Sequence, residues 1–365
     1  QQVWYPLNND YFYAYFGSAS PNLNLTSPEV TSEMKKVASF WVNEVGVDGF
    51  RLDAIGTLIP EGTKAMNTPA THRWLKDYQV YLKSLNPSFF TVGEIWDNNE
   101  VILPYVADEE IDLAFNFDLA FTAIRAINEG DPAPISEQVR DAKVTFPDGR
   151  YAIFLANHDM DRLLTQFGGN TQKARAAASI YLTLPGTPFI YYGEEIGMQG
   201  YAPDSGGRLP MQWSGGQNAG FTTQMPWKPI GSGFETLNVQ NELGKPLTLL
   251  THYQKLINLR GQYAVIRHGD VFTPEASQSR LYSSFSVLDN EAVLVIVNLS
   301  DSTFVNPKVS LPASTLPAGE YQLTDLFGSA AASTTTINAQ GGFENLSPAT
   351  QLLPWGTLIF RLDKP

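Results

Sequence analysis

The sequence contains no cysteine among its 365 residues. This absence excludes disulfide bonds, zinc sites with thiolate ligands and cysteine nucleophiles. It leaves the compartment open, because a chain without cysteine suits secretion and the cytosol alike. We expect a secreted or extracellular protein, with the cytoplasm as the alternative.

Basic residues and long apolar runs are also scarce. Lys and Arg number 24 against 37 Asp and Glu, which gives a formal net charge of -13. An acidic field of this size repels phosphate groups and anionic lipids, so it argues against a nucleic-acid or membrane partner. The most apolar window, residues 180–192, is interrupted by two prolines and a glycine, so it does not predict a membrane span.

Two short signatures of common enzyme classes are absent as well. No G-x-G-x-x-G follows a predicted strand, which argues against a dinucleotide-binding open sheet. No G-x-S-x-G is present, which argues against a serine hydrolase with a nucleophile elbow. With 43% hydrophobic and 17% charged residues, the chain nevertheless has the material for a sizeable core.

Strands and helices alternate along the first two thirds of the chain. Strands are predicted at 47–53, 89–94, 113–117, 151–155 and 188–192, with helical patterns at 27–46, 70–85, 171–182 and 247–260. This alternation is typical of parallel strands joined by crossover helices. From about residue 264, short alternating strands such as 292–297 and 357–362 predict a separate antiparallel domain, with a surface loop at 329–336.

Three acids follow predicted strands: Asp53, Glu94 and Asp159. In a (β/α)8 barrel, residues at the carboxyl ends of the strands line the mouth of the active site. Two acids about 5 to 5.5 Å apart can cleave a glycosidic bond with retention, one attacking the sugar while the other protonates the leaving oxygen. Arg51 precedes Asp53 by two residues and therefore shares its face, where it would keep the carboxylate ionised.

Each of these residues also has a plain structural interpretation. A single acid at a strand end is more often a cap or an ion-pair partner than a catalyst, and Trp96 could be a core side chain. The set of three acids is far more specific than any one of them.

The surrounding motifs resemble the α-amylase family of glycoside hydrolases, family 13. Residues 49–54 (GFRLDA) resemble its nucleophile strand, residues 92–96 (VGEIW) its acid/base strand, and residues 154–159 (FLANHD) its third carboxylate motif. Residues 184–197 (LPGTPFIYYGEEIG) are similar to its eighth strand and the following loop. Three motifs in this order are highly specific, and the resemblance covers nearly the whole chain.

The resemblance implies roles for particular residues. Asp53 would be the nucleophile, Glu94 the acid/base, and Asp159 a stabiliser of the transition state that binds sugar hydroxyls. The substrate-binding residues would be Arg51, His158, Trp96 and Arg208.

The resemblance also implies an α/β fold: a (β/α)8 TIM barrel with a C-terminal antiparallel β-sandwich. Residues 1–25 would be the tail of the family's excursion domain, 26–263 the barrel from strand four to strand eight, and 264–365 the all-β domain. The motif that ends the family's third strand does not occur before Asp53. We therefore expect the chain to be the C-terminal part of a longer polypeptide, with its N-terminal part, carrying strands one to three, as a partner.

Metal binding is the second departure from the family. Many amylases carry Lys-His shortly after the nucleophile, in a stretch that helps to hold calcium, whereas this chain has Ala54-Ile55-Gly56-Thr57. We expect no cofactor and no metal ligand in this chain, although the complete protein could still bind calcium.

These features predict a retaining glycosidase that cleaves α-1,4-glucosidic bonds in starch or maltooligosaccharides through a covalent glycosyl-enzyme. The alternatives are an α-glucosidase or a transglycosylase that uses the same residues, and a non-catalytic relative that acts as a binding subunit. The presence of all three acids argues against the last.

Overall fold

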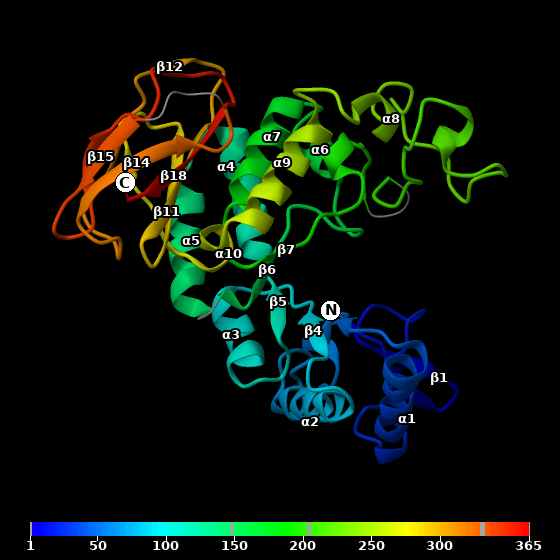
Figure 1. Cartoon of the computed structure of the whole chain (residues 1–365). Helices are drawn as coiled ribbons and strands as arrows, with labels where there is room; N and C mark the ends of the chain where they lie inside the picture. Colours follow the sequence, from blue (N-terminus) through cyan, green and yellow to red (C-terminus); the bar gives the residue numbers. More distant parts are fainter. Residues whose placement is uncertain (1, 147–148, 203–205, 329–332, 365) are drawn as a thin grey trace. The chain divides into compact units, whose positions relative to one another are not determined.

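The computed structural model describes residues 2–146, 149–202, 206–328 and 333–364 (Figure 1). Two compact units divide the chain: Gln1–Phe117 with Arg150–Ala152, and Asp118–Gly149 with Ile153–Pro365. In the described residues, every helix is too short or too polar to cross a membrane.

The first unit is built on parallel strands. They are β3 (Gly49–Leu52), β4 (Phe90–Gly93), β5 (Leu113–Phe115) and the start of β6 (Tyr151–Ile153), in this order. Leu52 is aligned with Gly93, so the residues that follow β3 and β4 leave the sheet at the same edge. The predicted strands in this region are confirmed to within a few residues.

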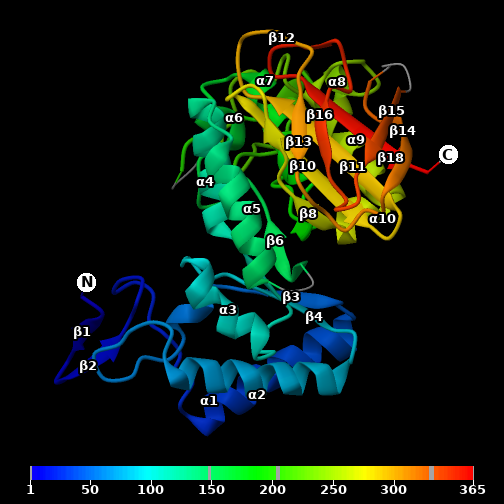
Figure 2. The same ribbon diagram turned by 90° about the vertical axis from the view of Figure 1, so that its left-hand side faces the viewer.

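Two helices pack side by side in the first unit (Figure 2). Helix α1 (Pro28–Ser39) begins at the N-cap Ser27, as the Ser-Pro-Glu sequence predicts, and α2 (Pro69–Leu85) lies beside it. The single helix expected up to Gly46 is wrong in detail. Residues Phe40–Val45 form a π-helix, η1. At its end the N–H of Gly46 donates to Trp41 O, five residues earlier, and Gly46 ends the element at φ +79°.

The first unit has four further elements. They are the hairpin of β1 (Trp4–Leu7) and β2 (Asp10–Tyr13), the short helix η2 (Ile55–Thr57), and α3 (Asn99–Ala107).

In its described residues, the second unit begins with helices and 3-10 turns that precede its antiparallel strands in the sequence. They are α4 (Phe117–Glu129), whose first residue belongs to the first unit, α5 (Ala133–Thr145), α6 (Leu163–Gln166), α7 (Thr171–Tyr181), α8 (Val239–Glu242), α9 (Leu249–Gln262) and α10 (Ala264–His268), with the 3-10 turns η4 (Glu194–Ile196) and η5 (Gln217–Gly220).

The strand predicted at 188–192 is shorter than expected. Strand β7 covers only Thr187–Pro188, and the N–H of Phe189 donates to Ile153 O at 2.8 Å. The chain then leaves the sheet, because the tyrosines that follow bond to another loop and Gly193 turns the backbone at φ +84°.

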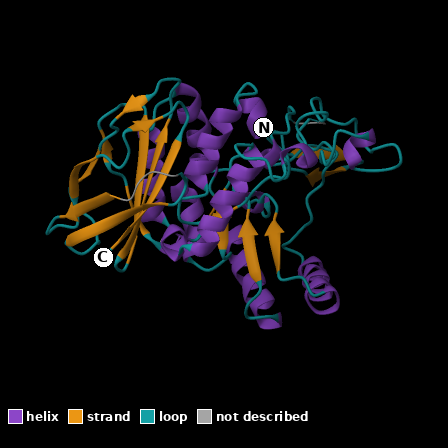
Figure 3. Ribbon diagram, turned by 45° about the horizontal axis from the view of Figure 1, so that its top comes forward, coloured by secondary structure: helices purple, strands orange, loops and turns teal. Residues whose placement is uncertain are grey.

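The antiparallel C-terminal region is confirmed. A six-stranded sheet has the order β15 (Ser333–Ile337), β14 (Gly319–Asp325), β18 (Thr357–Asp363), β11 (Glu291–Asn298), β10 (Leu281–Leu288) and β8 (Asp270–Phe272), and its strands appear as orange arrows in Figure 3. Smaller sheets comprise β16 (Phe343–Leu346), β13 (Val309–Leu311) and β9 (Glu275–Ala276), and β12 (Phe304–Val305) with β17 (Gln351–Leu352).

Strand β11 shows how this region joins the rest of its unit. One of its faces, with Leu294 and Ile296, lies in a core shared with β13 and β16, and the opposite face is also buried, because β11 packs against α7. The region begins one element later than expected, since 264–268 is the helix α10. The loop predicted at 329–336 is wrong for residues 333–336, which pair with β14; residues 329–332 lie outside the described residues.

Candidate active site

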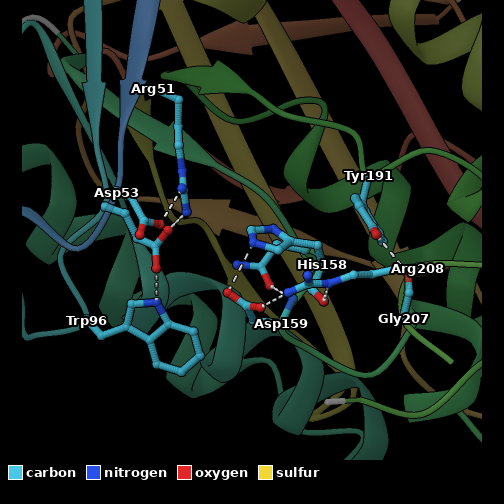
Figure 4. Close-up of polar contacts among 10 residues, drawn as sticks. Arg51, Asp53, Trp96, His158, Asp159, Tyr191, Gly207 and Arg208 are labelled. Carbon is cyan, nitrogen blue, oxygen red and sulfur yellow. Dashed lines mark hydrogen bonds and ion pairs between the residues drawn. The ribbon is translucent and has the colours of Figure 1, made fainter. Parts of the chain in front are cut away.

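Two of the predicted acids meet in the first unit at one arginine. Asp53 follows β3 and Glu94 follows β4, and the guanidinium of Arg51 forms an ion pair with each of them, through Nη1 to Asp53 Oδ1 and through Nη2 to Glu94 Oε2 (Figure 4). The side chain of Asp53 is 71% exposed, whereas that of Glu94 is 8% exposed. The shared face that alternation predicts for Arg51 and Asp53 is therefore confirmed.

Glu94 is held from a second direction by Trp96. The indole N–H of Trp96 donates to Glu94 Oε1 at 2.8 Å, and the ring lies 4.5 Å from that of Phe117. Because the side chain of Trp96 is nearly half exposed, one part of it orients the acid while the remainder faces solvent. The interpretation of Trp96 as a core residue is wrong.

The backbone around Glu94 leaves no room for larger residues. A Cβ on Gly93 would lie 2.6 Å from the Cδ1 atoms of both Ile55 and Ile111. The N–H of Ile55 donates to Glu94 O, and Glu94 N–H donates to Leu52 O. Tight packing and these two bonds hold the two strand ends together.

A cavity of about 290 Å³ adjoins Asp53 and Arg51. Apolar side chains dominate its wall, among them Leu25, Met34 and Trp74. The exposed nucleophile candidate therefore borders a hollow rather than a flat surface.

The third acid, Asp159, lies in the second unit. It follows β6 in a turn in which its own N–H donates to Asn157 Oδ1 at 2.9 Å. Arg208 Nη2 donates to Asp159 Oδ1 at 2.6 Å, Arg208 Nε donates to His158 O at 3.1 Å, and His158 Nε2 lies 3.2 Å from Asp159 Oδ2 (Figure 4).

The structure thus brings the seven predicted site residues together as two groups. Arg51, Asp53, Glu94 and Trp96 form the group in the first unit, and His158, Asp159 and Arg208 form the group in the second. The convergence of both groups on one sugar ring stays a prediction. Sequence reasoning missed Tyr191 and Tyr192, which fix the loop of Arg208; the only available signal was a pair of aromatic residues beyond a predicted strand end.

A further acid of the second unit has a strongly perturbed environment. Glu194 is fully buried, and its Oε1 accepts hydrogen bonds from Tyr181 at 2.6 Å and from Tyr253 at 3.1 Å. Burial raises the pKa of Glu194 to about 8. Through this carboxyl group, η4 is hydrogen-bonded to Tyr181 of α7 and Tyr253 of α9.

The residues after Asp53 do not fit a calcium site. Ala54–Thr57 offers a single side-chain oxygen, and that hydroxyl of Thr57 already donates to Ala54 O at 2.9 Å. Within the described ranges, no three His, Asp or Glu side chains are grouped as metal ligands. Calcium prefers six or more oxygen ligands, so this stretch supplies too few.

Comparison with known proteins places this architecture among carbohydrate-active enzymes. The family model described as the catalytic domain of alpha amylase matches residues 1–269. Alpha-amylase 3 of Dictyoglomus thermophilum is 34% identical over 308 residues, covering 83% of this chain and 60% of that protein. Oligo-1,6-glucosidase of Heyndrickxia coagulans is 29% identical, covering 80% of this chain and 65% of its own length.

Two further relatives extend the comparison. Trehalose synthase of Thermus thermophilus is 30% identical and covers 82% of this chain but 36% of that enzyme. The crystal structure of alpha-amylase from H. orenii superposes with a TM-score of 0.80 at 29% identity, covering 99% of this chain and 70% of that one. The chain therefore spans between about a third and two thirds of the length of these curated relatives.

Proposed function

Because the chain belongs to the α-amylase family of glycoside hydrolases, we propose that it carries the catalytic residues of a retaining glycosidase that cleaves α-1,4-glucosidic bonds in starch or maltooligosaccharides. The family implies a TIM barrel, and the parallel strands and antiparallel C-terminal sheets agree with the family fold. The observation that carries the proposal is the arrangement of two carboxylates on the guanidinium of Arg51, at the carboxyl ends of adjacent parallel strands.

The two acids differ in exposure in the way that their proposed roles require. Asp53 is open to an incoming sugar and attacks the anomeric carbon, while Glu94 donates a proton to the leaving oxygen as the glycosidic bond breaks. In the second step of the reaction, Glu94 takes a proton from water, and this water attacks the same carbon and releases Asp53. Two displacements at one carbon retain the α configuration.

The remaining residues bind and orient the substrate. Asp159 accepts hydrogen bonds from sugar hydroxyls, with His158 beside it. Arg51 pairs with the ionised Asp53 and also contacts the carboxyl group of Glu94, which carries a proton when it acts as the acid. Trp96 orients Glu94 and offers its exposed ring to the face of a sugar, while Arg208 fixes Asp159 and reaches the outer sugar.

The test is the loss of turnover without loss of folding. Asp53→Asn and Glu94→Gln are each expected to lower kcat on maltoheptaose by at least about a thousandfold. Asp77→Asn and Glu100→Gln are matched controls, because both acids are exposed on helices and neither is among the proposed site residues. Near-normal turnover in the first two variants, at unchanged melting temperature, would refute the proposal.

A second activity is an α-glucosidase or a transglycosylase that uses the same residues. It is supported by relatives named oligo-1,6-glucosidase and trehalose synthase. Water and an acceptor sugar compete for one covalent intermediate, so the product profile separates the activities. Maltooligosaccharides from maltoheptaose indicate an amylase, whereas glucose from isomaltose or rearranged disaccharides from maltose and sucrose indicate the alternatives. A non-catalytic binding subunit would bind maltoheptaose and release no product.

We propose further that barrel strands one to three come from an N-terminal part of the same polypeptide. In this proposal residues 26–263 supply strands four to eight, after an excursion-domain tail at 1–25 and before a β-sandwich at 264–365. Among the described residues, β3 has β4 as its one strand partner, and a closed barrel leaves no strand edge unpaired. The exposed Phe40 and Trp41 on η1 offer apolar surface for additional helices. Intact-mass analysis of the natural protein tests this: a stable, active species of only 40.3 kDa would refute it.

Any calcium would then be bound outside residues 54–57. We propose that this chain contributes no calcium ligand in that stretch. The Thr57→Val variant should therefore have the same activity as the wild-type protein, both after treatment with a chelator and after calcium is restored.

A further inference from the structure

The loop that carries Arg208 accepts hydrogen bonds from tyrosine hydroxyls on both sides of this residue. The hydroxyl of Tyr191 donates to the carbonyl oxygen of Gly207 at 2.8 Å, and the hydroxyl of Tyr192 donates to that of Leu209 at 2.6 Å. Figure 4 shows the bond from Tyr191 to Gly207 next to the side chain of Arg208. Consecutive tyrosines thus hold the carbonyl groups of the two residues on either side of Arg208.

The two tyrosines are themselves fixed by a buried cation. The guanidinium of Arg162 lies 5.0 Å from the ring centroid of Tyr191 and 4.6 Å from that of Tyr192, and its Nη1 donates to Tyr192 O at 2.7 Å. Arg162 is 1% exposed, so it forms a rigid base for both rings. Burial raises the pKa of Tyr191 to about 12, which keeps its hydroxyl protonated and able to donate.

The position of the loop matters because Arg208 contacts the carboxylate of Asp159. Its guanidinium bonds Asp159 Oδ1 and the carbonyl of His158, and both charged side chains are 40% or more exposed. An ion pair this exposed is weak by itself, because water screens it and two flexible side chains must be ordered. Fixing the backbone on both sides of Arg208 removes part of that ordering cost in advance.

The close approach of this loop to the turn that carries Asp159 also depends on Gly207. A Cβ at this position would lie 3.2 Å from His158 O and 3.3 Å from Met160 O. The loop therefore lies directly against the turn that carries Asp159, and the tyrosine hydroxyls hold it there.

We propose that Tyr191 and Tyr192 are positioning residues that act through Arg208 to fix the carboxylate of Asp159. The inference rests on the proposed function, because the orientation of Asp159 affects turnover only if this acid binds the substrate in the transition state.

The experiment is a double-mutant cycle in the complete protein, with maltoheptaose as substrate. Tyr191→Phe and Tyr192→Phe are each expected to lower kcat about two- to tenfold, with KM changed less, since each removes one hydrogen bond between neutral groups. In an Arg208→Ala background the same changes should lower kcat by less than about twofold, because their target is gone. Tyr321→Phe is the matched control: it deletes a hydroxyl bond of the same kind, to Pro317 O, in the C-terminal sheet, and should leave kcat unchanged.

Losses of equal size in both backgrounds would show a general structural role and overturn the proposal, as would wild-type kcat in the Tyr191→Phe/Tyr192→Phe variant. A second measurement is independent of turnover. The Nε–H resonance of Arg208, assigned with Arg208→Lys, should exchange with solvent several-fold faster in the double phenylalanine variant. Equal exchange rates would overturn the proposal. A wild-type protein that cleaves no glucan would refute the proposed function instead, and the exchange rates would then decide whether the tyrosines hold Arg208.

Discussion

Replacement of Arg51 by methionine should destabilise the first unit far more than the loss of an ordinary surface arginine. The guanidinium is the shared partner of Asp53 and Glu94, and the glutamate side chain is 8% exposed. Methionine keeps much of the apolar stem and removes the charge. Among the side chains that the structure describes, the indole of Trp96 is then the remaining donor to the buried carboxylate of Glu94.

The expected loss follows from the exposure of the partners. Removal of one member of a fully buried ion pair costs about 3–5 kcal/mol. Here the side chain of Arg51 is 35% exposed and that of Asp53 is 71% exposed, so solvent screens part of the interaction. The pair with Asp53 therefore contributes little, and the pair with Glu94 dominates. We expect Arg51→Met to lower the free energy of unfolding by about 2–3 kcal/mol.

Denaturation in urea measures this loss, and a second substitution identifies its cause. In the Arg51→Met background, Glu94→Gln removes the uncompensated charge and should restore about half of the lost stability or more. Arg73→Met is the matched control, because its 3.5 Å pair with Glu61 is exposed on both sides and should contribute less than about 1 kcal/mol. An Arg51→Met protein as stable as the Arg73→Met protein, or no recovery of stability with Glu94→Gln, would show that Arg51 does not stabilise the buried carboxylate of Glu94.

Three further predictions concern the same two units. Gly93→Ala should destabilise the protein by about 1–3 kcal/mol in urea denaturation, because the new methyl group would lie 2.6 Å from two isoleucine side chains; a neutral effect would mean that they move aside freely. Glu194 has a folded-state pKa of about 8 against an ordinary 4.5, so the folded state binds more protons between these values. Its contribution is complete below about pH 4.5 and is lost as the pH rises through 8, at no more than about 1.4 kcal/mol per pH unit. Glu194→Gln should flatten the decline in melting temperature over this range. An unchanged pH profile would show that Glu194 does not have the raised pKa. Trp96→Phe deletes the donor to Glu94 Oε1 and should lower kcat about tenfold. Trp227→Phe, at an exposed tryptophan outside the site, should leave kcat unchanged. Equal kcat values in the two variants would show that Trp96 does not orient Glu94.

The local features of the fold could be predicted because short-range patterns determine them. Alternation placed Arg51 and Asp53 on one face of a strand, and Ser27 with Pro28 marked the start of α1. The π-helix after α1 could not be predicted, because no short-range sequence pattern distinguishes backbone bonds that reach five residues back, as from Gly46 N–H to Trp41 O, from the usual four.

Features that depend on distant contacts were less accessible. Strand β7 is shorter than its apolar run suggests, because Tyr191 and Tyr192 leave the sheet to bond a loop 16 and 17 residues further along the chain. Arg208 meets Asp159 across 49 residues, which no periodic pattern records. The resemblance to a family supplied Arg208 and Asp159 as candidates but not the two tyrosines, and the contacts among these residues came from the structure.

Attack of Asp53 on the sugar can be observed by covalent trapping. The complete protein would be treated with a fluorinated glucosyl fluoride that forms a slowly hydrolysed glycosyl-enzyme, digested and analysed by mass spectrometry. One hexosyl adduct is expected on the peptide that contains Asp53; it should be absent from Asp53→Asn and longer-lived in Glu94→Gln. An adduct on another residue, or turnover that releases the β-anomer, would contradict this attack by Asp53.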